Sequence, residues 1–353
     1  MNDFAGGGAE RTISKYVTEL SRNGYDVLVV TLGDRVDFEL PENFRWHHLP
    51  PSRARPRFLR RWLRSRQLRE IIAEEGGISA FSIRISTLSE ADIVVSRAGY
   101  DGFIYRFAND YQAKAHRIAY PWFIRKLRER SIRSIYKQSK ILCVSEGLAD
   151  GARRMLRRDD ERIRTIYNPF DFDGVRELSK MPDPDIPAVP YIIHVGRAVR
   201  QKRHDLLIEA YKASGIPHKL VLLGRSSDRV KRLVADALLE DRVVLISFKQ
   251  NPYPLIANAQ ALVLSSDWEG LPNVLIEALI CGTPVVSTRC KYGPSEILTG
   301  PQARSLVEPG DAAALASAIR TVLADPPDLT QVDLEKFRLE GLVRKLEDFA
   351  AMP

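Results

Sequence analysis

Short apolar runs alternate along the chain with longer stretches in which apolar residues recur every three or four positions. The short runs are almost continuously apolar, which is typical of parallel strands that are covered on both faces. The longer stretches predict helices, for example at 204–213, 226–239 and 272–281. Strands are predicted at 25–31, 91–96, 140–145, 162–168, 190–196, 219–224, 242–247, 261–266 and 284–288. This alternation predicts an α/β protein with right-handed crossovers and doubly wound parallel sheets.

A proline-rich segment divides the pattern into two parts of similar length. The boundary between these parts is predicted near residues 168–189. The stretch MPDPDIPAVP, residues 181–190, contains four prolines in ten positions. Prolines at that density end helices and act as a semi-rigid connector. The chain has 353 residues, which is more than one hydrophobic core usually serves. We therefore expect two α/β lobes with a cleft between them.

The N-terminus departs from this pattern. MNDFAGGGAER reaches the glycines Gly6, Gly7 and Gly8 and continues directly into a helix. A glycine loop that opens a helix normally follows a strand, so the first strand of the N-terminal lobe is predicted to be missing. Its two neighbours would then have unpaired edges. The glycine N–H groups could bind a phosphate or sugar oxygen, and a frayed terminus is the alternative.

Composition narrows the class of protein. Hydrophobic residues make up 44% and charged residues 28%, as in folded soluble proteins. No apolar run reaches the roughly 18 residues of a membrane-spanning helix, and no signal peptide pattern is present. The three cysteines are far apart and the six histidines form no metal-binding motif. A reduced, cytoplasmic protein without a metal is therefore expected.

Basic charge is concentrated in one segment. The net charge is +8, and residues 53–70 contain eight arginines and one glutamate. Phe58, Leu59, Trp62 and Leu63 lie among them at near-helical spacing. An anionic membrane surface and a phosphate-bearing substrate are candidate partners, and a solvated helix face is the alternative. Nucleic acid is disfavoured, because no aromatic–basic interleaving or binding motif is present.

Glu277 is the one charged residue in an otherwise apolar helical stretch, 274–280. The turn that precedes this helix carries Glu269 and Gly270 and lies at the carboxyl end of a strand, where ligands bind in open α/β sheets. Gly270 is expected to adopt an unusual backbone conformation. Glu277 follows Glu269 by eight residues, so both side chains can face the same end of the sheet. Ligand hydroxyl groups or a buried cation would satisfy Glu277, and a salt bridge to a neighbouring strand is the alternative.

Two cations follow another predicted strand. Gly196 ends that strand, and Arg197 and Lys202 come before a helix that begins near residue 204. They could hold a diphosphate and stabilise its charge as it departs, without a metal. A basic surface loop is the alternative, and Arg203 is expected to be solvated. The polar loop 248–259, which includes Lys249 and Asn251, could hydrogen-bond the edge of a flat base or be an ordinary loop.

These motifs resemble those of the glycosyltransferase family 4 enzymes. EGLPNVLIEALICGTPVVST is similar to the Glu-x7-Glu signature of the family, VGRAVRQK to its phosphate site and IYNPFD to its interlobe connector. FKQNPYPLIANA and YGPSEIL resemble the subgroup that builds bacterial surface polysaccharides such as lipopolysaccharide or capsule. The resemblance implies the GT-B fold of two Rossmann-like lobes. It places an acceptor-side lobe at 1–168, a nucleotide-sugar-binding lobe at 169–334 and a final helix at about 335–349 that packs back on the first lobe.

The resemblance also implies roles for individual residues. Glu277 would hold the ribose hydroxyls of the donor, and Arg197 and Lys202 its diphosphate. Glu269 would contact the donor sugar together with the backbone of Gly270 and Leu271. Further residues implied at the site are Gly196 and Asn273 for the donor, Gly6, Gly7 and Gly8 for phosphate or acceptor, Lys249 and Asn251, and His116 as the nearest candidate for the histidine of the N-terminal lobe.

The activity implied is retaining, metal-independent transfer of a hexose or N-acetylhexosamine. The expected donor is a nucleotide sugar, most simply a UDP-sugar, with no further cofactor. The expected acceptor is a glycan or lipid-linked glycan at the inner face of the cell membrane, where residues 53–70 would dock on anionic lipid. Because the first strand is missing, a non-catalytic nucleotide-sugar-binding scaffold is the alternative.

Overall fold

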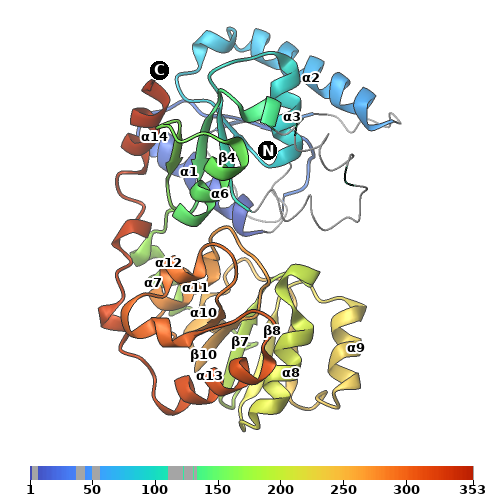
Figure 1. Ribbon diagram of the computed structural model, residues 1–353, viewed down its shortest axis with the longest axis vertical. Coiled ribbons are helices and arrows are strands. Elements are labelled where there is room, and N and C mark those ends of the chain that lie inside the picture. The colour runs from blue at the N-terminus through green and yellow to red at the C-terminus, as the bar shows by residue number, and fades with distance from the viewer. Residues whose placement is uncertain are drawn as a thin grey trace. The chain divides into compact units, whose positions relative to one another are not determined.

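The computed structural model describes residues 1, 7–36, 44–49, 56–109, 122, 130 and 133–352. The chain divides into two compact units: Met1–Pro169 together with Glu340–Pro353, here called the N-terminal unit, and Phe170–Leu339, the C-terminal unit. In each unit the described strands pair in parallel and alternate with helices (Figure 1). The predicted α/β class with parallel sheets is therefore confirmed. Among the described residues, no helix has both the length and the apolar character needed to cross a membrane.

The C-terminal unit is built on one six-stranded sheet with the strand order β12-β11-β10-β7-β8-β9. Its first strand in sequence, β7, therefore pairs with the fourth, β10, and the strand order reverses between them. In such a sheet the ligand crevice lies outside the carboxyl ends of the two strands at the reversal. The strands are β7 Tyr191–Val195, β8 Lys219–Leu223, β9 Val243–Ile246, β10 Ala261–Leu264, β11 Val285–Thr288 and β12 Leu306–Val307.

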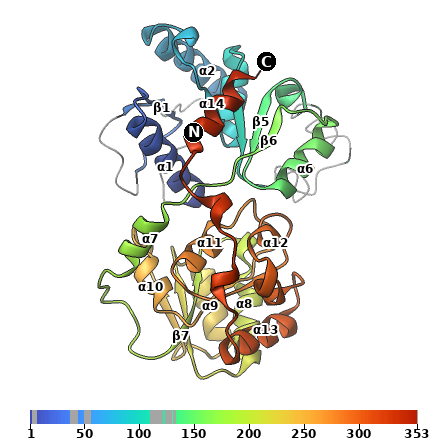
Figure 2. The same cartoon turned by 90° about the vertical axis from the view of Figure 1, so that its left-hand side faces the viewer.

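Helices cover both faces of this sheet (Figure 2). Leu207, Val234 and Ile319 from three helices pack in one core with alternate strand residues such as Ile192 and Val263. These three helices are α8 His204–Ser214, α9 Asp228–Asp236 and α13 Ala312–Ala324. The others are α7 Phe172–Ser179, α10 Tyr253–Ala257, α11 Asn273–Ile280 and α12 Pro294–Ile297. Burial on both faces explains why the strands read as continuous apolar runs.

The N-terminal unit has a four-stranded sheet, β3-β4-β5-β6, and a separate pair, β1-β2. No strand precedes α1 among the described residues, and Met1 alone bonds to the outer edge of β1. The strands are β1 Leu28–Thr31, β2 Arg45–His48, β3 Ile85–Thr87, β4 Ile104–Phe107, β5 Lys140–Cys143 and β6 Ile163–Thr165. The helices are α1 Gly8–Arg22, α2 Arg57–Glu74, α3 Ser89–Ala98, α6 Glu146–Leu156 and α14 Leu342–Ala351.

One predicted strand is wrong. Residues 91–96 belong to the helix α3, which ends at Gly99 in the left-handed conformation. Its buried residues Ala91, Val94, Val95 and Ala98 recur at helical spacing, and acidic residues occupy its first turn. The short apolar run within it was indistinguishable from a strand by pattern alone.

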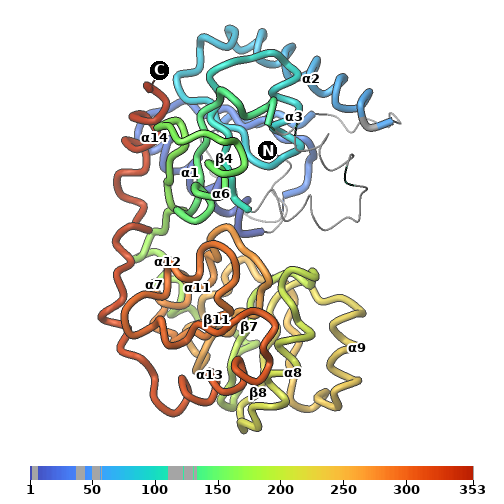
Figure 3. Tube along the Cα trace, viewed as in Figure 1, coloured from blue at the N-terminus to red at the C-terminus, as the bar shows by residue number. Residues whose placement is uncertain are grey.

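The last helix of the chain belongs to the N-terminal unit. α14 packs against α1, which lies at the opposite end of the sequence (Figure 3). Leu342, Leu346 and Phe349 are its buried residues. Lys140 at the start of β5 donates to the carbonyl of Ala350 at 2.6 Å, which fixes the end of α14 to the sheet.

Candidate functional site

The loops that follow β7 and β10 meet at the point where the strand order reverses. Ser265, directly after β10, donates its hydroxyl to the carbonyl of Lys202 at 2.7 Å. The N–H of Asp267 donates to the carbonyl of Gln201 at 3.0 Å. These bonds join the two loops at the carboxyl end of the sheet, so residues 63 to 67 positions apart in sequence become neighbours.

Glu269 and Lys202 form an ion pair in this junction. The Lys202 Nζ and the Glu269 Oε1 are 2.8 Å apart, and their side chains are 17% and 10% exposed. The Ser266 hydroxyl also donates to Glu269 Oε1, at 2.6 Å, and Gln201 Nε2 to Oε2, at 3.4 Å. The carboxylate therefore has three donors before any ligand arrives. The structure thus brings together two of the predicted site residues.

Glu277 is buried in α11, with 6% of its surface exposed. The hydroxyl of Tyr253, at the start of α10, donates to Glu277 Oε1 at 3.5 Å. Asn273 is the first residue of the same helix, and Leu271 is buried in the turn before it. The turn and helix predicted from the sequence are therefore present, and Gly282 ends the helix with a φ of 81° as expected of a C-terminal glycine.

Two glycine contacts shape the backbone around the junction. Gly224 after β8 has a φ of 146°, and a Cβ there would lie 2.3 Å from the carbonyl oxygen of Gly196. Gly293 has a φ of 87°, and a Cβ there would lie 2.5 Å from Pro272 Cδ. Neither Gly224 nor Gly293 was predicted from the sequence to shape the site. The unusual backbone expected at Gly270 is not found, since its φ is not in the left-handed region.

The remaining predicted cations behave differently from one another. Arg197 is exposed and forms no ion pair with the described residues, so its charge is available to a ligand. Arg203, expected to be solvated, instead pairs with Asp267 at 2.8 Å and with Asp205 at 3.0 Å. Its guanidinium therefore supports the loop after β10, which is a correction to the prediction.

The polar loop before α10 makes structural contacts. Lys249 Nζ lies 2.5 Å from Asp183 and 2.7 Å from Asp185, which belong to the proline-rich connector. Asn251 Nδ2 donates to the carbonyl of Leu178 at 2.9 Å. Neither side chain is brought to the Lys202–Glu269 pair by these contacts.

Two histidines pack behind the pair. The rings of His194 in β7 and His204 in α8 meet edge to face, with their centroids 4.9 Å apart. His194 Nδ1 hydrogen-bonds the carbonyl of Val263 at 2.8 Å. Burial lowers the pKa of His194 well below its usual value, and it lowers the pKa of His204 to about 4, with Lys202 adding to both shifts. Both rings are therefore neutral at pH 7 and serve as core residues beside a cation.

In the N-terminal unit, Gly7 caps α1 and Gly8 is its first residue. Gly6 and His116 lie outside the described residues, so their predicted roles stay predictions. Across the described ranges, no group of three or more histidine, cysteine or acidic side chains is placed to hold a metal ion.

The chain has two α/β units with parallel sheets, and the C-terminal unit carries an acid–cation pair where its strand order reverses. This arrangement defines a protein of the class with two Rossmann-like units. The chain matches the family model described as Glycosyltransferase Family 4 over residues 6–173 and the model described as Glycosyl transferases group 1 over residues 182–336. It belongs to the group 1 glycosyltransferases and has their GT-B fold.

Known proteins agree with this assignment. The chain is 26% identical over 335 residues to the N-acetylgalactosamine-N,N'-diacetylbacillosaminyl-diphospho-undecaprenol 4-alpha-N-acetylgalactosaminyltransferase of Campylobacter jejuni, covering 90% of this chain and 87% of that protein. The crystal structure of WaaG, a glycosyltransferase involved in lipopolysaccharide biosynthesis, is similar with a TM-score of 0.74, 18% identity and coverage of 100% and 99% of the two chains. The crystal structure of HepE from Anabaena in complex with UDP and glucose is similar with a TM-score of 0.73, 17% identity and coverage of 99% and 97%.

Proposed function

We propose that this glycosyltransferase transfers a hexose or N-acetylhexosamine from a UDP-sugar to a glycan or lipid-linked glycan in the synthesis of a bacterial surface polysaccharide. The observation that carries the proposal is the Lys202–Glu269 pair at the strand-order reversal of the C-terminal unit, with the buried Glu277 on the helix that follows. The names of the Campylobacter enzyme and of WaaG support a role in lipid-linked or lipopolysaccharide glycan synthesis.

The proposed mechanism uses charge and positioning. Arg197 and Lys202 bind the donor diphosphate and stabilise the charge that develops as it departs. Glu269, held by Ser266 and Gln201, orients Lys202 and faces the donor sugar. A departing phosphate oxygen takes the acceptor proton while the acceptor attacks from the same face, so the anomeric configuration is retained. No metal is needed, because the two cations carry the countercharge.

Glu277 is assigned to the ribose of the donor. Its carboxylate is buried beside the Tyr253 hydroxyl, and a carboxylate can accept hydrogen bonds from both ribose hydroxyls. Gly196 and Asn273 lie beside the same strand ends and contribute to donor binding. The glycines that open α1 and residues of the N-terminal unit are assigned to phosphate or acceptor.

The donor-binding role is tested with Glu277→Gln and Glu277→Ala. Loss of hydrogen bonds to a charged group should weaken donor binding by about 10- to 100-fold, measured by calorimetry with a panel of UDP- and GDP-sugars. Glu209→Ala removes an exposed carboxylate from α8 of the same unit and is the matched control, with affinity unchanged. Wild-type affinity in both Glu277 variants would remove the residue from the donor site.

A non-catalytic nucleotide-sugar-binding scaffold is the second candidate. It is favoured by the separation of β1-β2 from β3-β4-β5-β6, because no strand among the described residues joins the two sheets. The two functions separate in an assay of sugar transfer and sugar release with the same donor panel. Turnover supports the enzyme, whereas binding of a donor without turnover supports the scaffold.

Docking of α2 on an anionic membrane from the cytoplasmic side is proposed for the basic segment 53–70, of which residues 53–55 lie outside the described part. On α2, Phe58 is 62% exposed and Trp62 is 49% exposed. On the inner side of the helix, Arg61 pairs with Glu90 and Arg64 donates to the carbonyl of Leu32. Exposed aromatic side chains among arginines are the pattern of a helix that lies in a lipid interface.

A further inference from the structure

A cavity of about 700 Å³ opens at the amino ends of β4, β5 and β6 in the N-terminal unit. Its lining includes the turn at residues 99–103 that follows α3, Lys140 at the start of β5, and Arg162 just before β6. Ligands in open α/β sheets normally bind outside the carboxyl ends of the strands. The cavity lies at the opposite edge of its sheet, so the proposed transfer reaction does not use it.

Positive charge dominates the lining of this cavity. Among the described residues that line it, Lys137, Lys140 and Arg162 are cations and Asp101 is the one acid. None of the three cations forms an ion pair with a carboxylate in the described part of the chain. Burial lowers the pKa of Lys140, and repulsion from Arg162 and Arg84 adds to the shift. An anion in the cavity would relieve this repulsion.

The cations that line the cavity are fixed by neutral partners. Lys140 Nζ donates to the carbonyl of Ala350 at 2.6 Å and also to that of Met352. Arg162 Nη1 donates to the carbonyl of Gln138 at 3.3 Å. Carbonyl oxygens hold these side chains in position but do not cancel their charge. The positive charge of both groups therefore remains available to a ligand.

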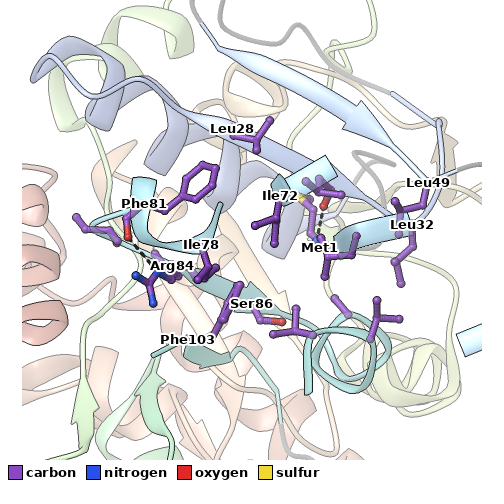
Figure 4. A pocket seen from close by; sticks show the side chains of 17 residues that line it. Met1, Leu28, Leu32, Leu49, Ile72, Ile78, Phe81, Arg84, Ser86 and Phe103 are labelled. Atoms are coloured by element: carbon purple, nitrogen blue, oxygen red, sulfur yellow. Dashed lines mark hydrogen bonds between the residues drawn. The ribbon is translucent and has the colours of Figure 1, made fainter. Parts of the chain in front are cut away.

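The turn at residues 99–103 is held by Arg84, which lies just before β3. Its Nε donates to the carbonyl of Phe81 at 3.0 Å (Figure 4), and its Nη1 donates to that of Asp101 at 3.1 Å. Gly102 in this turn has a φ of 77°, and a Cβ there would lie 2.8 Å from Arg84 Nη1. This close approach fixes one wall of the cavity and adds a fourth cation beside it.

Groups suited to a sugar ring line the same cavity. The hydroxyl of Tyr105 has no hydrogen-bond partner among the described residues, and burial raises its pKa, so it stays protonated and can donate. Ser134 and Gln138 add exposed polar side chains. The rings of Tyr100 and Phe103 are half-buried and offer apolar surface beside these polar groups. Sugars present hydroxyl groups and an apolar ring face together.

We propose that this cavity binds an anionic oligosaccharide through a sugar that bears a carboxylate or a phosphate. Lys137 and Arg162 bind the anionic group, and Tyr100 and Phe103 pack against the ring. A cavity of this volume holds a ligand of about the size of a disaccharide. A membrane surface fits less well, because it is flat whereas these cations line a hollow. Binding here is separate from binding of the donor by the C-terminal unit.

The binding is measured by calorimetry with digalacturonate, a disaccharide with two carboxylates, and with neutral digalactose. Digalacturonate should bind about tenfold or more tightly than digalactose, and its binding should weaken at high salt. The double variant Lys137→Met with Arg162→Met should lower the affinity for digalacturonate by about tenfold or more. The matched control is Arg154→Met with Lys345→Met, which removes two exposed cations of the same unit outside the cavity and should leave the affinity unchanged.

Further ligands identify the group that is recognised. Glucose 6-phosphate tests a phosphate in place of a carboxylate, and inorganic phosphate tests the ion alone. The donor-site variant Lys202→Met should bind digalacturonate as the wild type does, so a failure of the proposed donor site is distinguished from a failure of this cavity. Thermal unfolding of each variant shows that a lost affinity is not lost folding.

Several results would overturn the assignment. Neither anionic sugar binds the wild-type protein, digalactose binds as tightly as digalacturonate, or the cavity variant and the control lose affinity equally. Inorganic phosphate that binds as tightly as glucose 6-phosphate, without competition from digalacturonate, would make this a simple ion site. Loss of binding to phosphatidylglycerol vesicles in the cavity variant, with no binding of either sugar, would assign the cations to a membrane surface instead.

Discussion

Individual residues at the junction of the C-terminal unit are held in place by groups that are themselves fixed to the backbone. Lys202 is positioned through the Ser265 bond to its carbonyl, and Glu269 through Ser266 and Gln201. A cation and a carboxylate with most of their surface buried need this support, because an unpaired charge there would be costly. The pair therefore holds Lys202 at the carboxyl end of the sheet, where the proposed diphosphate site lies.

The lowered pKa of His204 predicts that the C-terminal unit loses stability at acid pH. Its pKa of about 4 in the folded protein lies below the usual 6.5, so the unfolded chain binds more protons between these values. Stability should therefore fall as pH falls from 6.5 toward 4. From pH 7.5 to pH 5, His204 alone should lower the free energy of unfolding of the C-terminal unit by about 2 kcal/mol.

Urea unfolding at the two pH values measures this change. The variant His204→Gln should lose about that much of the pH dependence. An unchanged slope in His204→Gln would show that the ring titrates normally in the folded protein.

The close packing around Gly224 predicts that adding a single methyl group there strongly destabilises the C-terminal unit. A Cβ at this position would meet the carbonyl oxygen of Gly196, a backbone atom, at 2.3 Å. Gly224→Ala should therefore destabilise the C-terminal unit by about 2–4 kcal/mol and displace the turn that carries Arg197. Gly215→Ala is the control, because Gly215 also has positive φ but has open space around it, and it should cost only about 1 kcal/mol. Equal costs in the two variants, measured by thermal unfolding, would contradict the close approach.

The site residues that could be predicted from the sequence lie at strand ends, whereas those that could not depend on contacts distant in sequence. Glu269 and Lys202 follow the ends of predicted parallel strands, and the ends of such strands share one edge of the sheet, so their approach was predictable. Gly224 and Gly293 act through close contacts with backbone far away in sequence, which no local pattern records. The pairing of Arg203 with Asp267 likewise depends on β7 and β10 being neighbours.

Among the elements, the continuity of the apolar run decided which strands could be predicted. β7 to β11 of the C-terminal sheet lie in nearly continuous apolar runs and were found. β2 (RWHH) and β3 (IST) were missed because they contain no apolar run, β12 because it has only two residues, and β4 because Arg106 interrupts its apolar run. In the fold Arg106 is fully buried, and its guanidinium donates to Asn168 at 2.6 Å. The helix α3 was mistaken for a strand since its short apolar run fits either period.

The exposed face of α2 predicts binding to anionic lipid. The double variant Phe58→Ser with Trp62→Ser should reduce binding to phosphatidylglycerol vesicles by about tenfold or more, since each aromatic side chain contributes on the order of 1–2 kcal/mol at the interface. Binding should also weaken at high salt, because the arginines act through screened charge. Co-sedimentation with vesicles measures both effects.

Leu238→Ser is the matched control for α2. Leu238 belongs to the C-terminal unit and is 82% exposed, so its loss removes a comparable apolar surface outside the basic segment. Vesicle binding should be unaffected by this change. Equal loss in the control, or undiminished binding by the double variant, would show that α2 is a solvated helix face.

At the scale of the whole molecule, the proline-rich connector could be predicted from the sequence. The packing of the last helix, α14, on the N-terminal unit could be predicted only from the family resemblance. Prolines 182, 184, 187 and 190 lie shortly after the point where the C-terminal unit begins. The packing of α14 on α1 joins the two ends of the sequence in one unit, although the whole C-terminal unit lies between them. The hydrophobic periodicity of α14 indicates which of its faces is buried but not which helix it packs against.

The division into units predicts where a nucleotide stabilises the protein. The proposed donor site uses residues of the C-terminal unit alone, so UDP at about 100 times its Kd should stabilise that unit by about 2.7 kcal/mol. Amide exchange should slow in β7, β10 and their following loops, and change little in β3 to β6. Lys202→Met should remove most of this protection, because the diphosphate loses a cation, whereas Lys231→Met, an exposed lysine on α9, should keep it. Protection confined to the N-terminal unit, or undiminished in Lys202→Met, would place the nucleotide elsewhere, because a ligand stabilises most strongly the unit whose folded form binds it.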